Sequence, residues 1–364
     1  MKKLALGLMS GTSLDGLSLA LGTFLEEKKS YQLVAYQTVP YPRDIQHDLQ
    51  QCIHLTVPEI SRLNFKIGKF YAVTAQSFLK NNKIPTKNIA VIGTHGQTIF
   101  HEPEGNPRNT LQIGEPSFLA QGTGIPVVSD FRPRAIAAGE EGAPLVPYFD
   151  HFFYGKGPVR AFQNIGGIGN VTVVGKGLSQ PLYFDTGPGN CLIDWAMLKI
   201  TGGRESFDNN GKFASKGNIR MDLVEKMAQH PYFNKRPPKS TGRELFNENF
   251  ILSRYKKLIQ HSPADFIATL TYFTAYTISQ SYKKFVLPSY TIKEVVISGG
   301  GEKNKTLLRY LGELLSPIPV CSYEKFGIPA QAKEPLAFAF FALRAVEGKE
   351  NHKGLILGKV TPQG

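Results

Sequence analysis

The feature that most constrains this chain is a recurring pattern: a β-prone run, a glycine-rich polar turn, and then a second element. It occurs at residues 4–21, 89–98, 183–200 and 294–315, with turns at 10–16, 93–98, 185–190 and 298–301. The first occurrence predicts a β-hairpin, and the last two predict helices at 191–200 and 304–315. Further helices are predicted at 59–79, 264–285 and 334–347. Strands alternating with helices indicate an α/β fold.

The second half of the chain opens in the same way as the first. Residues 159–162 and 170–174 read as strands joined by the turn 164–169, directly after the Gly-Lys-Gly-Pro break at 155–158. A length of 364 residues suits about two domains. We therefore predict two similar domains, residues 1–157 and 158–334, with a cleft between them. The last segment, about 335–364, is expected to pack back on the first domain.

Composition limits the function. The three cysteines, Cys52, Cys191 and Cys321, form no Cys-x-x-Cys motif, which disfavours structural zinc and fits a reducing cytoplasmic setting. The net charge of +13 is dispersed along the chain, so we expect no nucleic-acid partner. No apolar run approaches the ~18 residues that span a bilayer, so we expect no membrane partner, and the short run at 4–9 is a poor signal peptide.

Glycine-rich turns after strands expose backbone N–H groups that can hold phosphate oxygens. The signatures of P-loop proteins, protein kinases, dinucleotide folds and α/β-hydrolases are missing from the sequence. Two of the turns instead contain a carboxylate, Asp15 and Asp185. Phosphoryl transfer needs phosphate donors, Mg²⁺ and a carboxylate that holds the metal or takes a proton. Each Asp could also simply cap its turn.

Ordered blocks along nearly the whole chain resemble those of one family. The blocks are residues 7–16, 93–98, 111–114, 130–132, 142–147, 164–168, 184–190, 237–244, 268–271 and 299–301. On these blocks the chain is similar to the anhydro-N-acetylmuramic acid kinases of bacterial peptidoglycan recycling, within the group of sugar kinases, actin and Hsp70 chaperones. The resemblance implies two similar actin/RNase H-like domains with an interdomain cleft, and a homodimer.

The implied reaction uses ATP and water on 1,6-anhydro-N-acetylmuramic acid and gives N-acetylmuramic acid 6-phosphate and ADP. Water attacking the anomeric carbon needs a general base, and the resemblance assigns that role to Asp185. Glu334 matches a family carboxylate that holds the sugar. His95, Gln97 and Arg132 are further substrate-binding candidates, although His95 could equally stabilise its turn.

ATP is expected to lie on the glycine-rich turns, with Mg²⁺ bridging its phosphates and Asp15 as a candidate metal carboxylate. The candidate ATP-binding residues are Gly11, Thr12, Ser13, Leu14, Asp15, Gly16, Leu17, Ser18, Gly166, Gly167, Gly187, Gly189, Asn190, Gly299, Gly300 and Gly301.

Several positions depart from the family pattern. Ser18 stands where the family usually has Asp, Glu140 and Glu141 replace Gly-Gln, Gln331 replaces Asp, and Pro335 replaces Ala. Proline is tolerated in the first turn of a helix, where Pro335 is expected to lie. The departures leave two alternatives to an active family enzyme: a divergent sugar kinase of the same fold, or a catalytically weak nucleotide- or sugar-binding sensor. The two carboxylates that the chemistry requires are present, which favours the enzyme.

Overall fold

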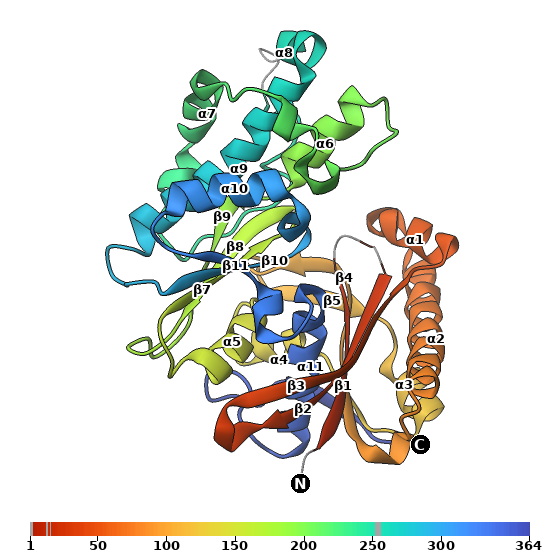
Figure 1. Ribbon diagram of the computed structural model, residues 1–364. Coiled ribbons are helices and arrows are strands. Elements are labelled where there is room, and N and C mark those ends of the chain that lie inside the picture. Colours follow the sequence, from red (N-terminus) through yellow and green to blue (C-terminus); the bar gives the residue numbers. More distant parts are fainter. Residues whose placement is uncertain (1–2, 12–13, 15, 252–255) are drawn as a thin grey trace. The chain divides into compact units, whose positions relative to one another are not determined.

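The computed structural model describes residues 3–11, 14, 16–251 and 256–364, and the chain divides into two compact units. Unit 1 comprises Met1–Phe153 and Gly327–Gly364, and unit 2 comprises Tyr154–Phe326 (Figure 1). Unit 1 is therefore discontinuous and contains both ends of the chain. The sequence-based boundaries at 157 and 334 differ from these, because the Gly-Lys-Gly-Pro break lies inside unit 2 and the chain returns to unit 1 before its last helix.

Unit 1 contains a mixed sheet and six helices among the described residues. Its strands are β1 (Leu4–Ser10), β2 (Gly16–Leu25), β3 (Ser30–Pro40), β4 (Ile89–Glu102), β5 (Asn109–Ile113), β6 (Val127–Ser129) and β12 (Lys359–Thr361). Its helices are α1 (Arg43–Gln50), α2 (Val57–Asn81), α3 (Pro116–Thr123), α4 (Phe131–Ala137), α5 (Val146–Tyr154) and α11 (Lys333–Val346).

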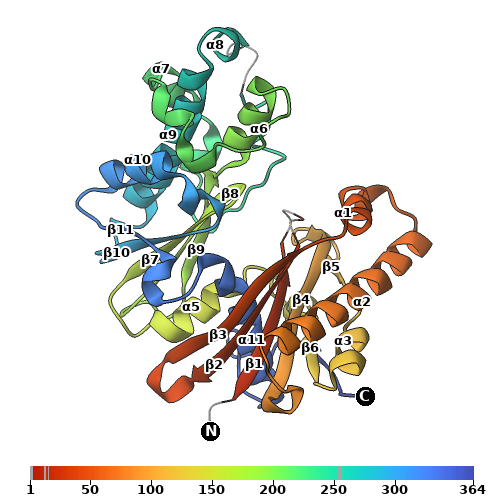
Figure 2. The same cartoon turned by 45° about the vertical axis from the view of Figure 1, so that its right-hand side comes forward.

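The strands of unit 1 lie in the order β12-β6-β4-β1-β2-β3, and β5 pairs with β4. The chain makes an antiparallel meander from β1 to β3, whereas β4 lies parallel to β1 and β6 lies parallel to β4. α11 packs on one face of this sheet, against β1, β2 and β4, and α2 covers the other face (Figures 1 and 2). Side chains that alternate along the strands thus contact a helix on each side.

Glycines on the strands let α11 approach the sheet closely. A Cβ at Gly7 would lie 2.6 Å from the carbonyl carbon of Pro335, and a Cβ at Gly93 would lie 2.7 Å from that of Phe338. A third strand glycine, Gly22, lies under the side chain of Leu336 in the same way. These glycines are needed for packing, because the helix backbone occupies the space of a side chain.

Unit 2 contains a second sheet and five helices among the described residues. Its strands are β7 (Arg160–Ile165), β8 (Ile168–Val174), β9 (Leu182–Pro188), β10 (Glu294–Ser298) and β11 (Val320–Ser322). Its helices are α6 (Cys191–Ile200), α7 (Met221–Ala228), α8 (Lys256–His261), α9 (Pro263–Phe285) and α10 (Lys305–Leu315). The long helix α9 packs on β9 and α10, and apolar side chains of both helices form one core with the sheet.

The five core strands of the two units have the same arrangement. The order is β6-β4-β1-β2-β3 in unit 1 and β11-β10-β7-β8-β9 in unit 2. In each unit the first three strands are antiparallel, and the fourth and fifth are added parallel on the side of the first. The predicted α/β fold with two similar actin/RNase H-like domains is confirmed by this repeated topology.

Two predicted turns are strands instead. β4 continues through residues 93–98, and β9 continues to Pro188 through the predicted turn at 185–190. The glycines there have other causes. Gly93 lies under the backbone of α11, and a Cβ at Gly187, whose φ is +130°, would lie 2.8 Å from the ring of Phe233. The helix predicted at 191–200 is α6 with the same bounds, and those predicted at 59–79, 264–285, 304–315 and 334–347 correspond to α2, α9, α10 and α11.

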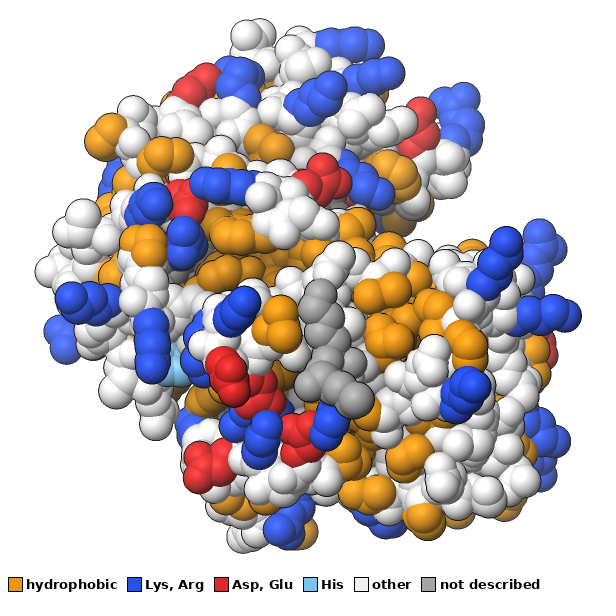
Figure 3. All heavy atoms as spheres, turned by 60° about the horizontal axis from the view of Figure 1, so that its bottom comes forward, with side chains coloured by type: hydrophobic (Ala, Val, Ile, Leu, Met, Phe, Trp, Pro, Cys, Tyr) orange, Lys and Arg blue, Asp and Glu red, His pale blue; other side chains and the backbone are white. Residues whose placement is uncertain are grey.

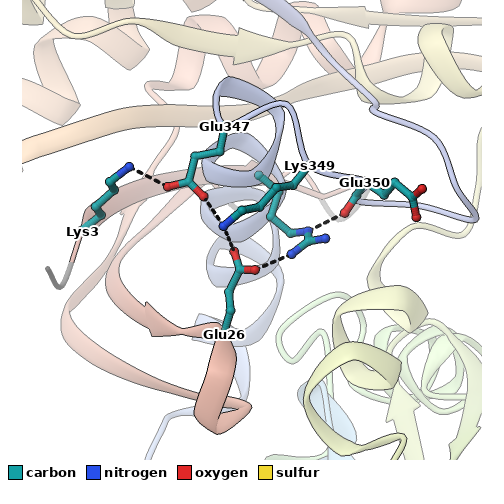
Figure 4. Close-up of polar contacts among 6 residues, drawn as sticks. Lys3, Glu26, Glu347, Lys349 and Glu350 are labelled. Carbon is teal, nitrogen blue, oxygen red and sulfur yellow. Dashed lines mark hydrogen bonds and ion pairs between the residues drawn. The ribbon is translucent and has the colours of Figure 1, made fainter.

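A cluster of ion pairs joins the start of the chain to the end of α11 (Figure 4). Arg344 pairs with Glu26, at the tip of the β2–β3 hairpin, at 2.6 Å. Lys349 pairs with Glu347 at 2.8 Å and with Glu26 at 3.4 Å, and Lys3 pairs with Glu347 at 2.7 Å. The cluster fastens the C-terminal helix of unit 1 to the strands on which it packs.

One face of the molecule carries its charges in a dispersed way. Figure 3 shows Lys and Arg side chains scattered over one face, with acidic side chains among them. Within the described ranges, no helix has both the length and the apolar character needed to cross a membrane.

Candidate active site

Asp185 lies in β9 and is 7% exposed. Its carboxylate accepts hydrogen bonds from the Thr241 backbone N–H at 2.9 Å and from the Tyr183 hydroxyl at 3.3 Å. Its backbone is held as well: its N–H donates to the carbonyl of Lys239 at 3.0 Å, and its carbonyl accepts from the Tyr232 hydroxyl at 2.7 Å. The carboxylate therefore has a defined orientation, set by the segment that contains Lys239 and Thr241.

Burial raises the pKa of Asp185 from 3.8 to about 6. The hydrogen bonds from Thr241 and Tyr183 and the charge of Lys239 oppose that rise, because each favours the ionised form. A carboxylate with a pKa near neutrality is ionised at physiological pH and still basic enough to accept a proton. This combination is what a general base requires.

Glycine-rich segments of unit 2 meet beside β9. The N–H of Gly189 donates to the carbonyl of Gly167 at 2.9 Å, and the N–H of Asn190 donates to that of Gly166 at 2.7 Å. A Cβ at Gly189 would overlap the carbonyl oxygen of Gly166, so only glycine permits this approach.

The turn after β10 lies against the same segments. Gly299 has a φ of +84°, and a Cβ there would lie 2.8 Å from the carbonyl oxygen of Ile165. Gly300 lies beside the side-chain amide of Asn190, and Gly301 lies against Ile165. The structure thus brings together the nucleotide-binding candidates of unit 2, which are Gly166, Gly167, Gly187, Gly189, Asn190, Gly299, Gly300 and Gly301. Glycine turns of this kind have no Cβ atoms, so a phosphate group can approach their backbone closely.

The glycine-rich turn of unit 1 joins β1 to β2. The N–H of Leu14 donates to the carbonyl of Gly11 at 3.2 Å, and Leu14 has a φ of +59°. Gly16 has a φ of +147° and lies against the backbone of Val39. Leu17 is fully buried in the core. The candidates Thr12, Ser13 and Asp15 lie outside the described residues, so their roles in binding ATP or metal stay predictions.

Buried hydroxyl groups lie next to this turn and are linked to it by hydrogen bonds. The Ser10 hydroxyl lies 2.6 Å from the Tyr71 hydroxyl, which lies 3.0 Å from that of Tyr41. Tyr41 donates to the Gln97 side-chain carbonyl at 3.1 Å, and the Gln97 amide donates to the Gly11 carbonyl at 3.2 Å. Gln97 is fully buried. The Gln97 side chain therefore connects the Tyr41 hydroxyl to the glycine-rich turn at Gly11.

His95 and Arg132 form a pair in unit 1. The Arg132 Nε donates to the His95 Nε2 at 2.9 Å, and the His95 Nδ1 lies 2.9 Å from the carbonyl of Gly96. Burial and the Arg132 guanidinium lower the pKa of His95 to about 3, so the ring is neutral. Because Nε2 accepts, the proton lies on Nδ1 and is donated to Gly96. His95 thus orients Arg132.

A cavity of about 350 Å³ lies next to this pair within unit 1. Three blocks singled out in the sequence contribute to its wall, through His95, Gln112 and Asp130. Asp130 has a φ of +54° and precedes α4, which carries Arg132.

Glu334 lies in the first turn of α11 and is exposed. The protein atoms around the Glu334 carboxyl reduce its hydration and raise its pKa, and the charges of Lys333 and Arg132 oppose this rise. Lys333, next to it in the chain, is buried and pairs with the fully buried Asp150 of α5 at 2.6 Å. This buried ion pair anchors the end of α11 that presents Glu334.

No group of three or more His, Cys, Asp and Glu side chains suited to a metal ion occurs in the part of the chain that the structure describes.

The relatives of this chain decide its family. A sequence model described as anhydro-N-acetylmuramic acid kinase matches residues 3–352. A curated protein of that name from Caldanaerobacter subterraneus is 40% identical over 96% of this chain and 93% of its own length. Another from Clostridioides difficile is 38% identical over 99% of this chain and 98% of its own. The chain belongs to the anhydro-N-acetylmuramic acid kinase family. The family and kinase class expected from the sequence are thereby confirmed.

A solved structure, component A of (R)-2-hydroxyglutaryl-CoA dehydratase from Acidaminococcus fermentans, matches the chain with a TM-score of 0.49 and 14% identity. The match covers 95% of this chain and 99% of that chain.

The departures from the kinase family pattern have local partners in the structure. Glu140 pairs with Lys353 at 2.7 Å, so the added charge is compensated within unit 1. Pro335 lies in the first turn of α11, as predicted, where no intrahelical N–H is needed. The Ser18 hydroxyl lies 2.9 Å from that of Thr38 on β3, and Gln331 is exposed.

Sequence reasoning missed several residues around the two sites. It did not single out Tyr183, Tyr232 or Lys239 as neighbours of Asp185, nor the pair of Asp150 with Lys333. Lys239 had a partial signal, because it belongs to the family block at 237–244. Tyr183 lies two residues from Asp185 on the same strand, but no motif marks it. For Tyr232 and the Asp150–Lys333 pair the sequence carries no signal, since their importance arises from contacts between distant segments.

Proposed function

We propose that this protein is an ATP-dependent kinase that opens 1,6-anhydro-N-acetylmuramic acid with water and phosphorylates its O6, in recycling of the cell wall. The observation that carries the proposal is the environment of Asp185: a buried, oriented carboxylate with a pKa near 6, in a chain of this family. The products would be N-acetylmuramic acid 6-phosphate and ADP.

In the proposed reaction, Asp185 takes a proton from water as the water oxygen bonds to the anomeric carbon. The bond between that carbon and O6 breaks, and its electron pair stays on O6. O6 then bonds to the γ-phosphorus of ATP as the bond to the leaving ADP oxygen breaks. The bonds from Thr241 and Tyr183 aim the Asp185 carboxylate at one water. Orientation of this kind is a large part of general-base catalysis.

The glycine-rich segments would hold ATP. In unit 2 the turns around Gly166, Gly189 and Gly299 pack closely without side chains, which would let phosphate oxygens come near their backbone. In unit 1 the turn from Gly11 to Ser18 would do the same. Mg²⁺ bound with ATP would neutralise charge on the phosphates, and Asp15 is the proposed carboxylate for it.

On the sugar side, we propose Glu334 as the carboxylate that holds the substrate and Arg132 as a cation for its lactyl carboxylate. His95 supports Arg132, because its neutral ring accepts from the guanidinium. Gln97 would act through the turn that it holds at Gly11. His95 and Gln97 therefore act as positioning residues.

The cellular setting follows from the proposed substrate. ATP is found inside the cell, so a kinase acting with it would work in the cytoplasm. We also propose a homodimer, which sedimentation or light scattering of the purified protein would test.

The test is turnover in ¹⁸O-water with ATP, Mg²⁺ and 1,6-anhydro-N-acetylmuramic acid, read by mass spectrometry. We expect a 6-phosphate sugar with one ¹⁸O at the anomeric carbon. Asp185→Asn keeps the size of the side chain and is expected to lower the rate by about 10²–10⁴-fold, the usual contribution of a general base. ADP formed with another sugar alone would indicate a divergent sugar kinase. ATP binding without turnover of any sugar would indicate a sensor.

A further inference from the structure

Lys239 is a buried cation beside the proposed base. It is 8% exposed. Its Nζ lies 4.7 Å from the ring centroid of Tyr232, 4.8 Å from that of Phe285 and 5.9 Å from that of Phe184. The ammonium donates to the carbonyl oxygen of Tyr232 at 3.4 Å. An aromatic cage with one long hydrogen bond keeps the charge in place and solvates it weakly.

The same segment holds Asp185 through its main chain. The carbonyl of Lys239 accepts from the Asp185 N–H, and the Thr241 N–H donates to the Asp185 carboxylate. Tyr232, which contacts the ammonium, also donates its hydroxyl to the Asp185 carbonyl. None of these bonds uses the side chain of Lys239. The lysine side chain can therefore be changed while the hydrogen bonds that orient Asp185 are kept.

We propose that Lys239 is a positioning residue for the base: its charge, held in the aromatic cage beside the backbone of Asp185, favours the ionised form of the Asp185 carboxyl. The inference rests on the proposed function and assigns one more residue to the same site. The aromatic cage holds the charge of Lys239 at a constant place, and the low polarity around it strengthens the electrostatic attraction between Lys239 and Asp185.

Among the residues that the structure describes, four other titratable groups act on the pair. Tyr183 and Tyr232 contact Asp185, and Glu244 acts on it as a like charge. Lys284 acts on Lys239 as a like charge. The charge of Lys239 lowers the pKa of Asp185, against burial. Burial and Lys284 lower the pKa of Lys239 to about 8, while Asp185 raises it. The two groups thus stabilise each other's charged forms.

This arrangement has a kinetic consequence. With Lys239 charged, Asp185 is ionised at a lower pH but is a weaker base. Without the charge, Asp185 would be protonated over a wider range of acidic pH, yet it would accept a proton more readily wherever it is ionised. Loss of the charge should therefore shift the pH profile, whereas a purely structural defect would lower activity by the same factor at every pH.

Lys239→Met keeps the length and packing of the side chain in the cage and removes the charge. We expect the acidic limb of its kcat/KM profile to move up by about one pH unit, which is about a tenfold loss on that limb. Above about pH 8 its rate should equal or exceed that of the wild type. Lys239→Arg keeps a cation in the cage and should restore the original limb. An acidic limb that stays in place in Lys239→Met would overturn the proposal.

A second measurement does not depend on turnover. The carboxyl carbon of Asp185, labelled with ¹³C and assigned with Asp185→Asn, reports its titration directly by NMR. We expect its main step near pH 6 in the wild type and a smaller second step near pH 8, where Lys239 loses its proton. The absence of any step near pH 8, with Asp185 titrating normally, would refute the coupling. A wild type without sugar turnover would refute the proposed function, and the ¹³C titration would still decide the role of Lys239.

Discussion

Gly7→Ala tests the close approach of α11 to the sheet. A Cβ at Gly7 would lie 2.6 Å from the Pro335 carbonyl carbon and 2.8 Å from the Ala339 nitrogen, where ordinary contacts begin at 3.4 Å. Both neighbours are backbone atoms, so no side-chain rotation relieves the overlap. The Pro335 carbonyl oxygen lies closer still to this Cβ, so α11 must withdraw by more than ~1 Å, a gap that removes about half or more of the dispersion energy between the facing atoms.

Overpacking of a core by one methyl group costs about 1–3 kcal/mol. Because the obstacle is a whole helix, we expect about 3 kcal/mol here, and a midpoint of thermal unfolding lower by about 6–12 °C for a domain of this size. Circular dichroism measures the midpoint. Gly312→Ala is the control: nothing lies within 4 Å of its Cβ, and alanine should stabilise α10 by about 0.5–1 kcal/mol. A midpoint for Gly7→Ala within about 2 °C of the wild type would refute the reasoning.

Two further predictions concern buried charges. Asp185 has a pKa of about 6 in the folded state against 3.8 as an ordinary carboxyl, so the folded protein binds the extra proton and loses stability as pH rises through this range. Asp185→Asn should therefore raise the free energy of unfolding at pH 8 by up to about 3 kcal/mol, and by far less at pH 4. Urea unfolding measures this effect, and equal effects at pH 8 and pH 4 would contradict the prediction. Asp150→Asn or Lys333→Met alone should lower the free energy of unfolding by about 3–5 kcal/mol, because each leaves the other buried group without its ion-pair partner. The double variant should lose less than the sum of the two single losses. Additive losses in urea unfolding would show that the pair is not coupled.

The two similar domains and their main elements were largely predictable from the sequence, whereas the order of the strands was not, and the glycine-rich turns were only partly so. The β-prone runs and the helical spacing of leucines predicted the main elements, because these patterns reflect which faces are buried. The turn predicted at 93–98 was wrong for a physical reason. Glycine serves both a turn and a close approach by a helix, since both need the missing Cβ, and the sequence around Gly93 does not distinguish them.

The candidate site shows the same division. Asp185 and Glu334 were found from the family blocks, because their chemistry is carried by residue type and local motif. Apart from Tyr183 on the same strand, the neighbours that hold Asp185 come from segments about 50 residues away in the sequence, as the Tyr232 and Thr241 hydrogen bonds show. Such contacts form only in the tertiary fold, so no local sequence pattern indicates them. The Asp150–Lys333 pair spans an even larger separation.

The discontinuity of unit 1 bears on how the protein is made. During synthesis, strands β1 to β6 of unit 1 emerge before unit 2, but α11, which covers one face of their sheet, is translated only after unit 2. Unit 2 is continuous and is complete in the nascent chain before that helix appears. Domains generally fold as units during synthesis, so unit 2 can finish folding while one face of the unit 1 sheet is not yet covered by α11. Translation of residues 327–364 is then the step that completes the core of unit 1, and a chain truncated before α11 would leave the ribosome with that face of the sheet exposed.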